Sequence, residues 1–313
     1  MSTYLIVSIC IGLLLDFLLG DPRGMPHIVR LVGWLSEVFE KLATRLLGRS
    51  VLGGLLLWLL VAAVVVNVYW FVASWLGSWS AWARIAFDGL IVFQCVAYRD
   101  LVRHVLAVKD ALGRSLEEGR SRVSWIVGRD TDRMQEDDVC RAAVESGAEN
   151  LSDAVIAPLF WGALLGPLGF LIYRISNTMD AIVGHRTERY EKVGKVSARI
   201  DDALNFIPAR LCCLAILPFK LIAQAPRLRE DANLHPSFNA GWPEAAMAKT
   251  LGVVIGGRMY EGGKLVQTKE MNKGARQPNR DDIRRLTEVM GRAYLKVLAL
   301  AALYWGAMAL FSA

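Results

Sequence analysis

One long apolar run limits what this chain can fold into. Residues 51–76 read VLGGLLLWLLVAAVVVNVYWFVASWL, without a single charged side chain. A helix of this length can cross the ~30 Å hydrocarbon core of a bilayer. Aromatic rings favour the membrane–water interface. Here they lie in the last part of the run and just after it, at Tyr69, Trp70, Trp75, Trp79 and Trp82. The run therefore predicts a membrane-embedded helix with an aromatic belt at one end.

The composition agrees with a membrane protein. Of the 313 residues, 54% are hydrophobic and the mean hydropathy is +0.34, whereas soluble domains are nearer 45–50% apolar. The net charge is +6, but Lys and Arg alternate with Asp and Glu and form no basic stripe. We therefore expect membrane lipid and small anionic molecules as partners, and no nucleic acid.

Further apolar stretches predict additional membrane segments. Residues 2–19, 84–98 and 293–312 are candidate spans, the first of them a retained helix and not a cleaved signal. Residues 154–173 and 206–225 are interrupted by Pro and Gly, which is tolerated at membrane depth only inside protein or along a cavity. We expect an all-α polytopic protein with about 4–6 membrane segments, some of them broken or re-entrant.

The distribution of Lys and Arg predicts the orientation. The loop 20–50 carries four Arg and one Lys and should be cytoplasmic. If the interrupted stretches do not cross fully, the polar segments 99–153, 174–205 and 226–292 all face the cytoplasm. Residues 1–313 then form a single integral membrane domain whose active site faces the cytoplasm.

The five cysteines lack CxxC spacing and lie mostly in or beside apolar runs. They are expected to be small, reduced, buried side chains, without disulfide or zinc.

The polar stretch that begins near Trp125 contains the first group of candidate site residues. Glu145, Glu149 and Asp153 recur at i, i+4 and i+8 of a predicted helix, so they share one face. Three stacked acids with Asn150 beside them suit Mg²⁺ and phosphate. A solvated helix face with salt bridges explains the same spacing. Arg129 and Asp130 precede this helix.

Two further groups follow along the chain. In the first, Asn177 and Asp180 are spaced to ligate one metal ion, while Arg186 and Arg189 share a face that suits phosphate. An interfacial helix with basic anchors is the alternative. The second group opens an apolar segment, where unpaired charges are costly, and so favours function; it comprises Arg199, Asp201, Asp202, Asn205 and Arg210.

Two loop segments are weaker signals. Residues 235–244 (HPSFNAGWPE) read as a structured loop at a membrane interface. Residues 256–265 are rich in glycine but miss the P-loop spacing, because neither Ser nor Thr follows Lys264. Any bound nucleotide is therefore held without a Walker motif.

Taken together, the ordered motifs resemble the adenosylcobinamide-phosphate synthase family of cobalamin biosynthesis. The resemblance covers nearly the whole chain and rests on GDPR at 20–23, WIVGRDTD at 125–132, VESGAENLSDAVIAPLFW at 144–161, NTMD at 177–180, SARIDDALNFIPARL at 197–211 and HPSFNAGWPEAAMA at 235–248. It implies a multi-pass enzyme of the bacterial inner membrane that joins an aminopropanol, usually as its phosphate, to a propionate carboxyl of adenosylcobyric acid. ATP hydrolysis would drive this amide ligation, and other corrin-pathway enzymes are possible partners.

This chemistry suggests roles for the candidate residues. Formation of an acyl phosphate needs metal and arginine to neutralise charge, and the attacking amine must lose a proton. Mg²⁺ and ATP phosphates would be held by Glu145, Glu149, Asp153 and Asp180. Phosphate would be stabilised by Arg129, Arg186, Arg189 and Arg199. Asp201 or Asp202 would accept the proton. The remaining cofactor contacts would come from Asp130, Asn150, Asn177, Asn205 and Arg210.

Two alternatives stay open on the sequence alone. NTMD partly matches the Asp-rich magnesium motifs of a membrane prenyl or phosphotransferase. A catalytically idle membrane sensor related to the family is the other alternative, although it predicts eroded polar clusters.

Overall fold

The computed structural model describes residues 3–22, 24–184, 190–223 and 225–311. The chain is mostly helical and forms two compact units, which are described separately. Unit 1 comprises residues 1–97, 157–205 and 301–313, and unit 2 comprises residues 98–156 and 206–300. The single-domain organisation stays a prediction.

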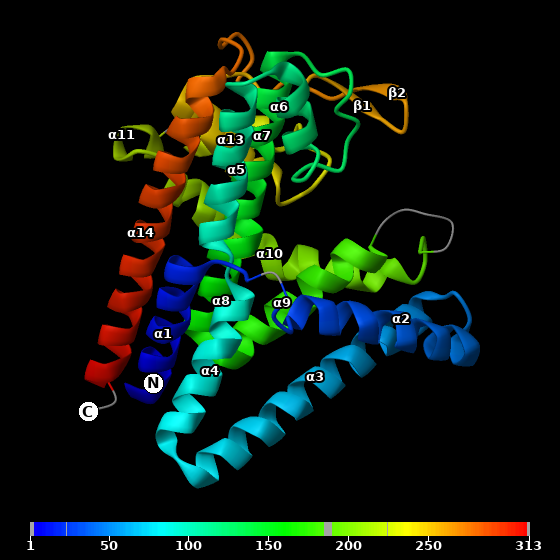
Figure 1. Ribbon diagram of the computed structural model, residues 1–313, viewed down its shortest axis with the longest axis vertical. Coiled ribbons are helices and arrows are strands. Elements are labelled where there is room, and N and C mark those ends of the chain that lie inside the picture. The colour runs from blue at the N-terminus through cyan, green and yellow to red at the C-terminus, as the bar shows by residue number, and fades with distance from the viewer. Residues whose placement is uncertain (1–2, 23, 185–189, 224, 312–313) are drawn as a thin grey trace. The chain divides into compact units, whose positions relative to one another are not determined.

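Unit 1 contains α1 (Thr3–Leu19), α2 (Ile28–Leu47), α3 (Val51–Trp79), α4 (Ala81–Cys95), α8 (Ala157–Leu165) and α9 (Pro167–Val183) (Figure 1). Unit 2 contains α5 (Tyr98–Leu112), α6 (Leu116–Val123), α7 (Glu136–Leu151), the π-turn η1 (Ser152–Ile156), α11 (Phe219–Ile222), α12 (Ala225–Ala232), α13 (Gly241–Leu251), β1 (Arg258–Glu261) and β2 (Lys264–Gln267). Two helices contribute to both units, namely α10 (Gly194–Ile216) and α14 (Arg280–Phe311).

Two of the described helices are long and apolar enough to cross a membrane. They are α3 and the Arg280–Leu310 part of α14, which include the predicted spans 51–76 and 293–312. The predicted spans 2–19 and 84–98 form shorter helices. Helix α1 has 17 residues and α4 has 15. Two such helices give weak support for membrane association, and the expected 4–6 segments are not confirmed.

The two interrupted stretches differ from each other. In the stretch 154–173, α8 and α9 are separated at Gly166, whose φ of 66° is the left-handed conformation that glycine adopts readily. In the stretch 206–225, Pro208 lies inside α10 without ending it. The helix ends only before Pro218, which caps the short α11. The interruption expected in this stretch therefore lies at Pro218 and not at Pro208.

Helices α1 and α4 pack closely within unit 1 because small residues face each other. A Cβ atom on Gly12 would lie 2.6 Å from the carbonyl oxygen of Gly89. A Cβ atom on Gly89 would in turn lie 2.9 Å from Ile11 Cγ2. Glycine at both positions lets the two backbones approach, which is a common device where apolar helices associate.

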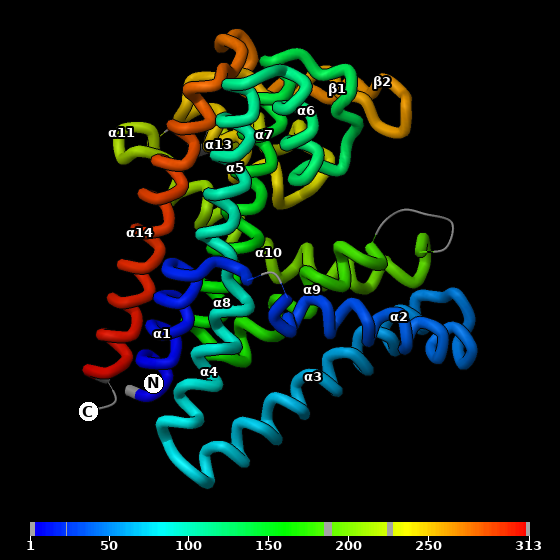
Figure 2. The backbone as a smooth tube through the Cα atoms, in the orientation of Figure 1, coloured from blue at the N-terminus to red at the C-terminus, as the bar shows by residue number. Residues whose placement is uncertain are grey.

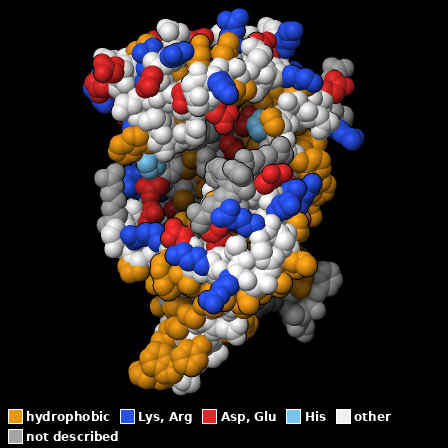
Figure 3. Space-filling model, turned by 90° about the vertical axis from the view of Figure 1, so that its right-hand side faces the viewer, with side chains coloured by type: hydrophobic (Ala, Val, Ile, Leu, Met, Phe, Trp, Pro, Cys, Tyr) orange, Lys and Arg blue, Asp and Glu red, His pale blue; other side chains and the backbone are white. Residues whose placement is uncertain are grey.

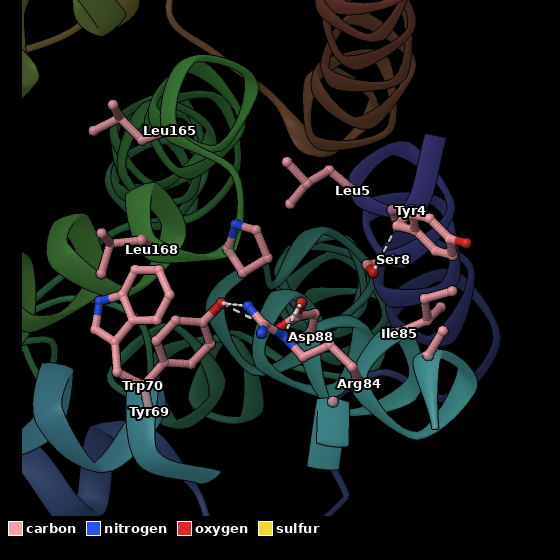
Figure 4. Close-up of a pocket in the computed structure, with 13 residues that line it drawn as sticks. Tyr4, Leu5, Ser8, Tyr69, Trp70, Arg84, Ile85, Asp88, Leu165 and Leu168 are labelled. Atoms are coloured by element: carbon pink, nitrogen blue, oxygen red, sulfur yellow. Dashed lines mark hydrogen bonds and ion pairs between the residues drawn. The ribbon is translucent and has the colours of Figure 1, made fainter. Parts of the chain in front are cut away.

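A polar network ties α3 to α4 (Figure 4). The Tyr69 hydroxyl donates to Asp88 Oδ1 at 3.0 Å, and Arg84 Nε donates to Asp88 Oδ2 at 2.8 Å. These side chains lie in a pocket of about 490 Å³ whose other walls are largely apolar, including Leu165 and Leu168. Each charged group has its partner, as buried charges require, so we assign the network a structural role.

The corner where α3 meets α4 exposes aromatic side chains. Trp79 is 71% exposed and Trp82 is 73% exposed, and the ring of Trp75 is tilted against that of Trp79 with ring centroids 4.7 Å apart. In Figure 3 this corner is the hydrophobic lower end of the surface. Exposed aromatic rings of this kind suit a membrane–water interface, as the sequence predicts.

In unit 2, helix α7 packs against α5 and α13. The strands β1 and β2 pair as an antiparallel hairpin that projects from these helices (Figure 2). The Asp130 carboxylate anchors the hairpin, because Gly263 N donates to its Oδ2 at 2.7 Å and its backbone bridges Tyr260. The all-α expectation therefore holds except for this hairpin.

Candidate functional site

Helix α7 positions the acids of the first cluster. It begins after Gln135, whose backbone N–H donates to Asp138. The first turn carries three acids, whose negative charge interacts favourably with the positive end of the helix dipole. One side of α7 carries Glu145, which is buried. Arg129 Nη2 donates to Glu145 Oε2 at 2.5 Å, and Gly256 N donates to Glu145 Oε1 at 2.7 Å. Glu145 therefore joins the loop before α7 to the segment before β1.

Two more carboxylates lie in the electrostatic neighbourhood of Glu145. Burial raises the pKa of Glu149, Glu145 raises it further, and Arg129 lowers it. Burial also raises the pKa of Glu244 on α13 well above its usual range, and both Glu145 and Glu149 add to the rise. The three carboxyl groups thus influence one another around one guanidinium, and burial favours the protonated forms of Glu149 and Glu244. We call Arg129, Glu145, Glu149, Glu244 and His235 the acid cluster.

His235 completes the acid cluster. Its Nδ1 accepts a hydrogen bond from Ser237 N at 2.9 Å, so in the neutral ring the proton lies on Nε2. That nitrogen is 3.6 Å from Glu244 Oε1. Burial lowers the pKa of His235, which keeps the imidazole neutral near pH 7. The HPSF turn therefore presents a neutral histidine to a buried acid.

A polar cavity of about 610 Å³ lies beside the acid cluster. Arg129 and Gly256, which both bind Glu145, form part of its wall. Arg133, Arg141 and Arg258 line it as well. The cavity therefore places arginines next to the two residues that bind Glu145, and its own lining includes the acids Asp137, Asp138 and Glu270.

Replacing Gly256 by alanine is expected to lower the free energy of unfolding by about 1–3 kcal/mol, because its φ of 80° is strained for a side chain. Its Cβ would also lie 2.4 Å from the Lys269 carbonyl oxygen. Gly262→Ala is the matched control, since φ there is 57° and a Cβ would meet nothing within 4 Å. Chemical denaturation of both variants checks this, and equal losses would contradict the role of the close contact.

The second cluster lies in unit 1, where α9 faces the start of α10. The Tyr173 hydroxyl donates to Asn205 Oδ1 at 2.9 Å, and Asn205 Nδ2 donates to Asp201 Oδ2 at 2.9 Å. Asn177 Nδ2 donates to the other oxygen of Asp201 at 3.5 Å. We call Tyr173, Asn177, Asp180, Asp201 and Asn205 the aspartate network. Two of the three asparagines predicted from the sequence, Asn177 and Asn205, lie in it.

The aspartate network holds a carboxylate with an unusual protonation equilibrium. Burial raises the pKa of Asp201 to about 7, and the neighbouring charge of Asp180 contributes. The hydrogen bonds from Asn205 and Asn177 oppose this rise. A group with this pKa can accept and release a proton near neutral pH.

A small pocket of about 150 Å³ in unit 1 lies at the start of the N-terminal motif, where Gly20 and Asp21 line it. It is lined by Asp21, His27 and Arg174, among other residues. His27 caps α2 by accepting from Val29 N at 3.2 Å, and Arg174 donates to the Cys95 carbonyl oxygen and to Asn177 Oδ1. Arg174 thus connects this pocket to the aspartate network.

Several predicted site residues have structural contacts. The Asp130 carboxylate anchors the hairpin, and Asn150 Nδ2 donates to the Ser146 carbonyl oxygen at 2.9 Å. Arg210 Nη1 donates to Asn239 Oδ1 at 2.7 Å. The Arg210 guanidinium also lies over three aromatic rings, those of Phe206, Phe238 and Trp242. These contacts explain the positions of all three side chains without invoking a bound ligand. The predicted roles of these residues in cofactor binding stay predictions.

The predicted metal set is divided between the units. Glu145, Glu149 and Asp153 belong to unit 2, and Asp180 belongs to unit 1. Asp153 lies on the π-turn, where the α-helical spacing used in the prediction no longer applies. Asp202 lies beside Asp201, and their charges interact.

Two predicted phosphate ligands, Arg186 and Arg189, lie outside the described residues. Arg199, on α10, is exposed.

Sequence reasoning missed three residues that the structure brings into the clusters. His235 and Glu244 lie nine positions apart in the loop that the sequence presents as a weak signal. The motif HPSFNAGWPE could have indicated this pair, because it begins with His235 and ends with Glu244 and contains Pro and Gly, which favour turns, between them. Tyr173 had no such signal, since it stands in an apolar run and only the fold brings it to Asn205.

Comparison with known proteins identifies the family. The sequence matches the CobD/Cbib protein family over residues 9–290. The chain belongs to this family. No solved structure matches it.

Curated relatives in this family are similar along most of the chain. A protein of Pelobacter propionicus is 38% identical over 265 residues, which is 82% of each chain, and is named cobalamin biosynthesis protein CobD. A CobD protein of Klebsiella pneumoniae is 35% identical over 95% of this chain and 97% of its own. The cobalamin biosynthesis protein CbiB of Salmonella typhi is 35% identical over 94% of this chain and 96% of its own. Family membership confirms the resemblance drawn from the motifs.

Proposed function

We propose that the chain is an adenosylcobinamide-phosphate synthase, an ATP-dependent ligase of cobalamin biosynthesis. It would join the amine of an aminopropanol, carried as its phosphate, to a propionate carboxylate of adenosylcobyric acid. The observation that carries this proposal is the acid cluster, in which three carboxylates with one arginine lie beside a cavity lined with arginines. Such a set suits a reaction in which phosphate charge must be neutralised.

The reaction proceeds in two balanced steps. The propionate carboxylate attacks the γ-phosphorus of ATP, giving an acyl phosphate and ADP. The free amine then attacks the acyl carbon, a C–N bond forms, and inorganic phosphate leaves. The ammonium form of the amine loses its proton to a base before or during attack. Asp201, whose pKa is about 7, is our candidate for that base.

The acid cluster offers the oxygen ligands that a magnesium ion prefers. Among the described residues no three His, Cys, Asp or Glu side chains are placed to hold one metal ion. Mg²⁺ usually takes only one or two protein carboxylates together with substrate phosphates. Glu149 is the carboxylate available for this, because Glu145 already binds Arg129 and Gly256 and Glu244 faces His235. When bound, Mg²⁺ would neutralise phosphate oxygens of ATP.

The proposal also includes an inner-membrane location with the reacting groups open to the cytoplasm. The apolar helices α3 and α14 and the exposed tryptophans of the α3–α4 corner support it. A substrate as large and amphiphilic as a corrinoid suits an enzyme at a membrane surface.

The deciding experiment is a turnover assay with the full chain in nanodiscs. Adenosylcobyric acid, aminopropanol phosphate, Mg²⁺ and ATP are incubated with the protein, and the corrinoid product is followed by mass spectrometry. We expect a product that gains the aminopropanol phosphate only when ATP is present. Folded protein that forms no amide with either the free or the phosphorylated amino alcohol would contradict the proposal and favour the sensor or prenyltransferase alternatives.

A further inference from the structure

The cavity of unit 2 has charged and apolar walls. Four arginines line it together with three acids, Asp137, Asp138 and Glu270, while Met134, Met259, Tyr260 and Leu265 add apolar and aromatic surface. Its volume of about 610 Å³ lies within the range of about 300–1,000 Å³ that small-molecule sites occupy. An amino alcohol phosphate needs far less space and has no large apolar part. A nucleotide has both a phosphate chain and a flat, stackable base.

The four arginines of the cavity are not equivalent. Arg129 pairs with Glu145, while Arg141 pairs with Asp138 and also donates to the Arg258 carbonyl oxygen. Arg133 and Arg258 are exposed, and no ion pair is found for either guanidinium within the described ranges. These two guanidinium groups are therefore available to an anion.

Contacts around the hairpin hold the two available arginines at this cavity. The Arg133 guanidinium lies 5.2 Å from the centre of the Tyr260 ring, a cation–π contact. Asp130 bridges Tyr260 and binds Gly263, so the loop that carries Arg133 is fixed to the hairpin. Arg258 begins β1, directly after Gly256 and Gly257. Both glycines have positive φ, 80° and 89°, which brings bare backbone to the cavity wall.

We propose that this cavity is the nucleoside triphosphate site, in which Arg133 and Arg258 bind the phosphate chain and the Tyr260 side of the cavity accepts the base. This inference rests on the proposed ligase function, because that reaction needs a phosphoryl donor. It places the γ-phosphate end at Arg129, which connects the cavity to the acid cluster. The glycine-rich segment thus contributes to nucleotide binding although it lacks the Walker spacing.

Direct binding tests the site without turnover. The full chain in nanodiscs is titrated with the fluorescent nucleotide mant-ATP and Mg²⁺, in the absence of corrinoid. We expect Arg133→Ala and Arg258→Ala each to weaken binding roughly tenfold, as lost charge-assisted hydrogen bonds do. Arg114→Ala is the control, because Arg114 is 60% exposed and pairs only with the surface residue Glu118. Thermal unfolding verifies that all three variants are folded.

Three outcomes overturn the inference. They are unchanged nucleotide affinity in the variant that lacks both arginines, equal losses in the Arg114 control, and failure of the wild-type protein to bind mant-ATP. Binding of aminopropanol phosphate in place of nucleotide, with the same dependence on both arginines, would assign the cavity to the other substrate. Turnover is scored separately. A protein that binds nucleotide through these arginines but forms no amide would retain this site and refute the ligase function.

Discussion

Replacing Asp201 by asparagine is expected to lower turnover roughly 10²–10⁴-fold, the usual contribution of general base catalysis. The wild-type rate should rise with pH through about 7, because burial and Asp180 raise the pKa of Asp201 to that value and the base must be ionised. Asp201→Asn removes this inflection. The measurement is kcat against pH with saturating substrates.

The same substitution is expected to stabilise the protein above neutral pH. A carboxyl group whose pKa is raised in the folded state binds more protons there than in the unfolded state, so its contribution to stability is lost as pH rises. For Asp201 this loss extends from its usual pKa, 3.8, to about 7. Asparagine cannot ionise, so Asp201→Asn should melt at a higher temperature than the wild type at pH 8.

Asp202→Asn is the matched control, because Asp202 is the neighbouring acid and its charge acts on Asp201. It should retain the inflection near the same pH. If Asp202→Asn loses the inflection and Asp201→Asn keeps it, the two roles are reversed.

Glu149→Gln is expected to reduce turnover roughly 10²–10³-fold, the loss typical of removing one preorganised charge contact in a transition state. Stability at pH 8 should not fall, because burial and Glu145 raise the pKa of Glu149 and ionisation in the fold is unfavourable. By the same linkage, the stabilising contribution of this group is lost as pH rises above its usual pKa of 4.5. Turnover and thermal unfolding, measured side by side, check both parts.

Glu118→Gln serves as the control for the acid cluster, since this side chain is 48% exposed on α6. It should leave turnover and unfolding unchanged. A large fall in stability for Glu149→Gln would contradict our account, because it would show that Glu149 holds the fold together and is not an acid kept for function.

The sequence predicted the long helices better than their ends. The apolar run at 51–76 became α3 because nothing in it interrupts a helix. The candidate span 293–312 began too late, because α14 is continuous from Arg280 and charged residues such as Arg284 and Glu288 face outward without breaking the helix. Pro208 was expected to interrupt the chain, but a single proline can be accommodated within a helix.

The candidate sites were predictable by residue type but not by grouping. Periodicity placed Glu145 and Glu149 on one face correctly, because both lie on α7. It could not reveal that Glu244 approaches from α13 or that Asn205 meets Tyr173, since those contacts depend on packing between distant segments. The hairpin also escaped prediction, because its strands are only four residues long and exposed.

The tryptophans of the α3–α4 corner give the protein a built-in optical probe. Trp75, Trp79 and Trp82 supply three of its ten indoles and are all exposed on one corner. Their fluorescence can therefore report the lipid that surrounds them, without any attached dye, in a variant in which the other exposed tryptophans, Trp34, Trp70 and Trp125, are replaced by phenylalanine. In vesicles made with lipids brominated at successive acyl positions, the depth at which quenching is strongest would give the level of this corner in the bilayer.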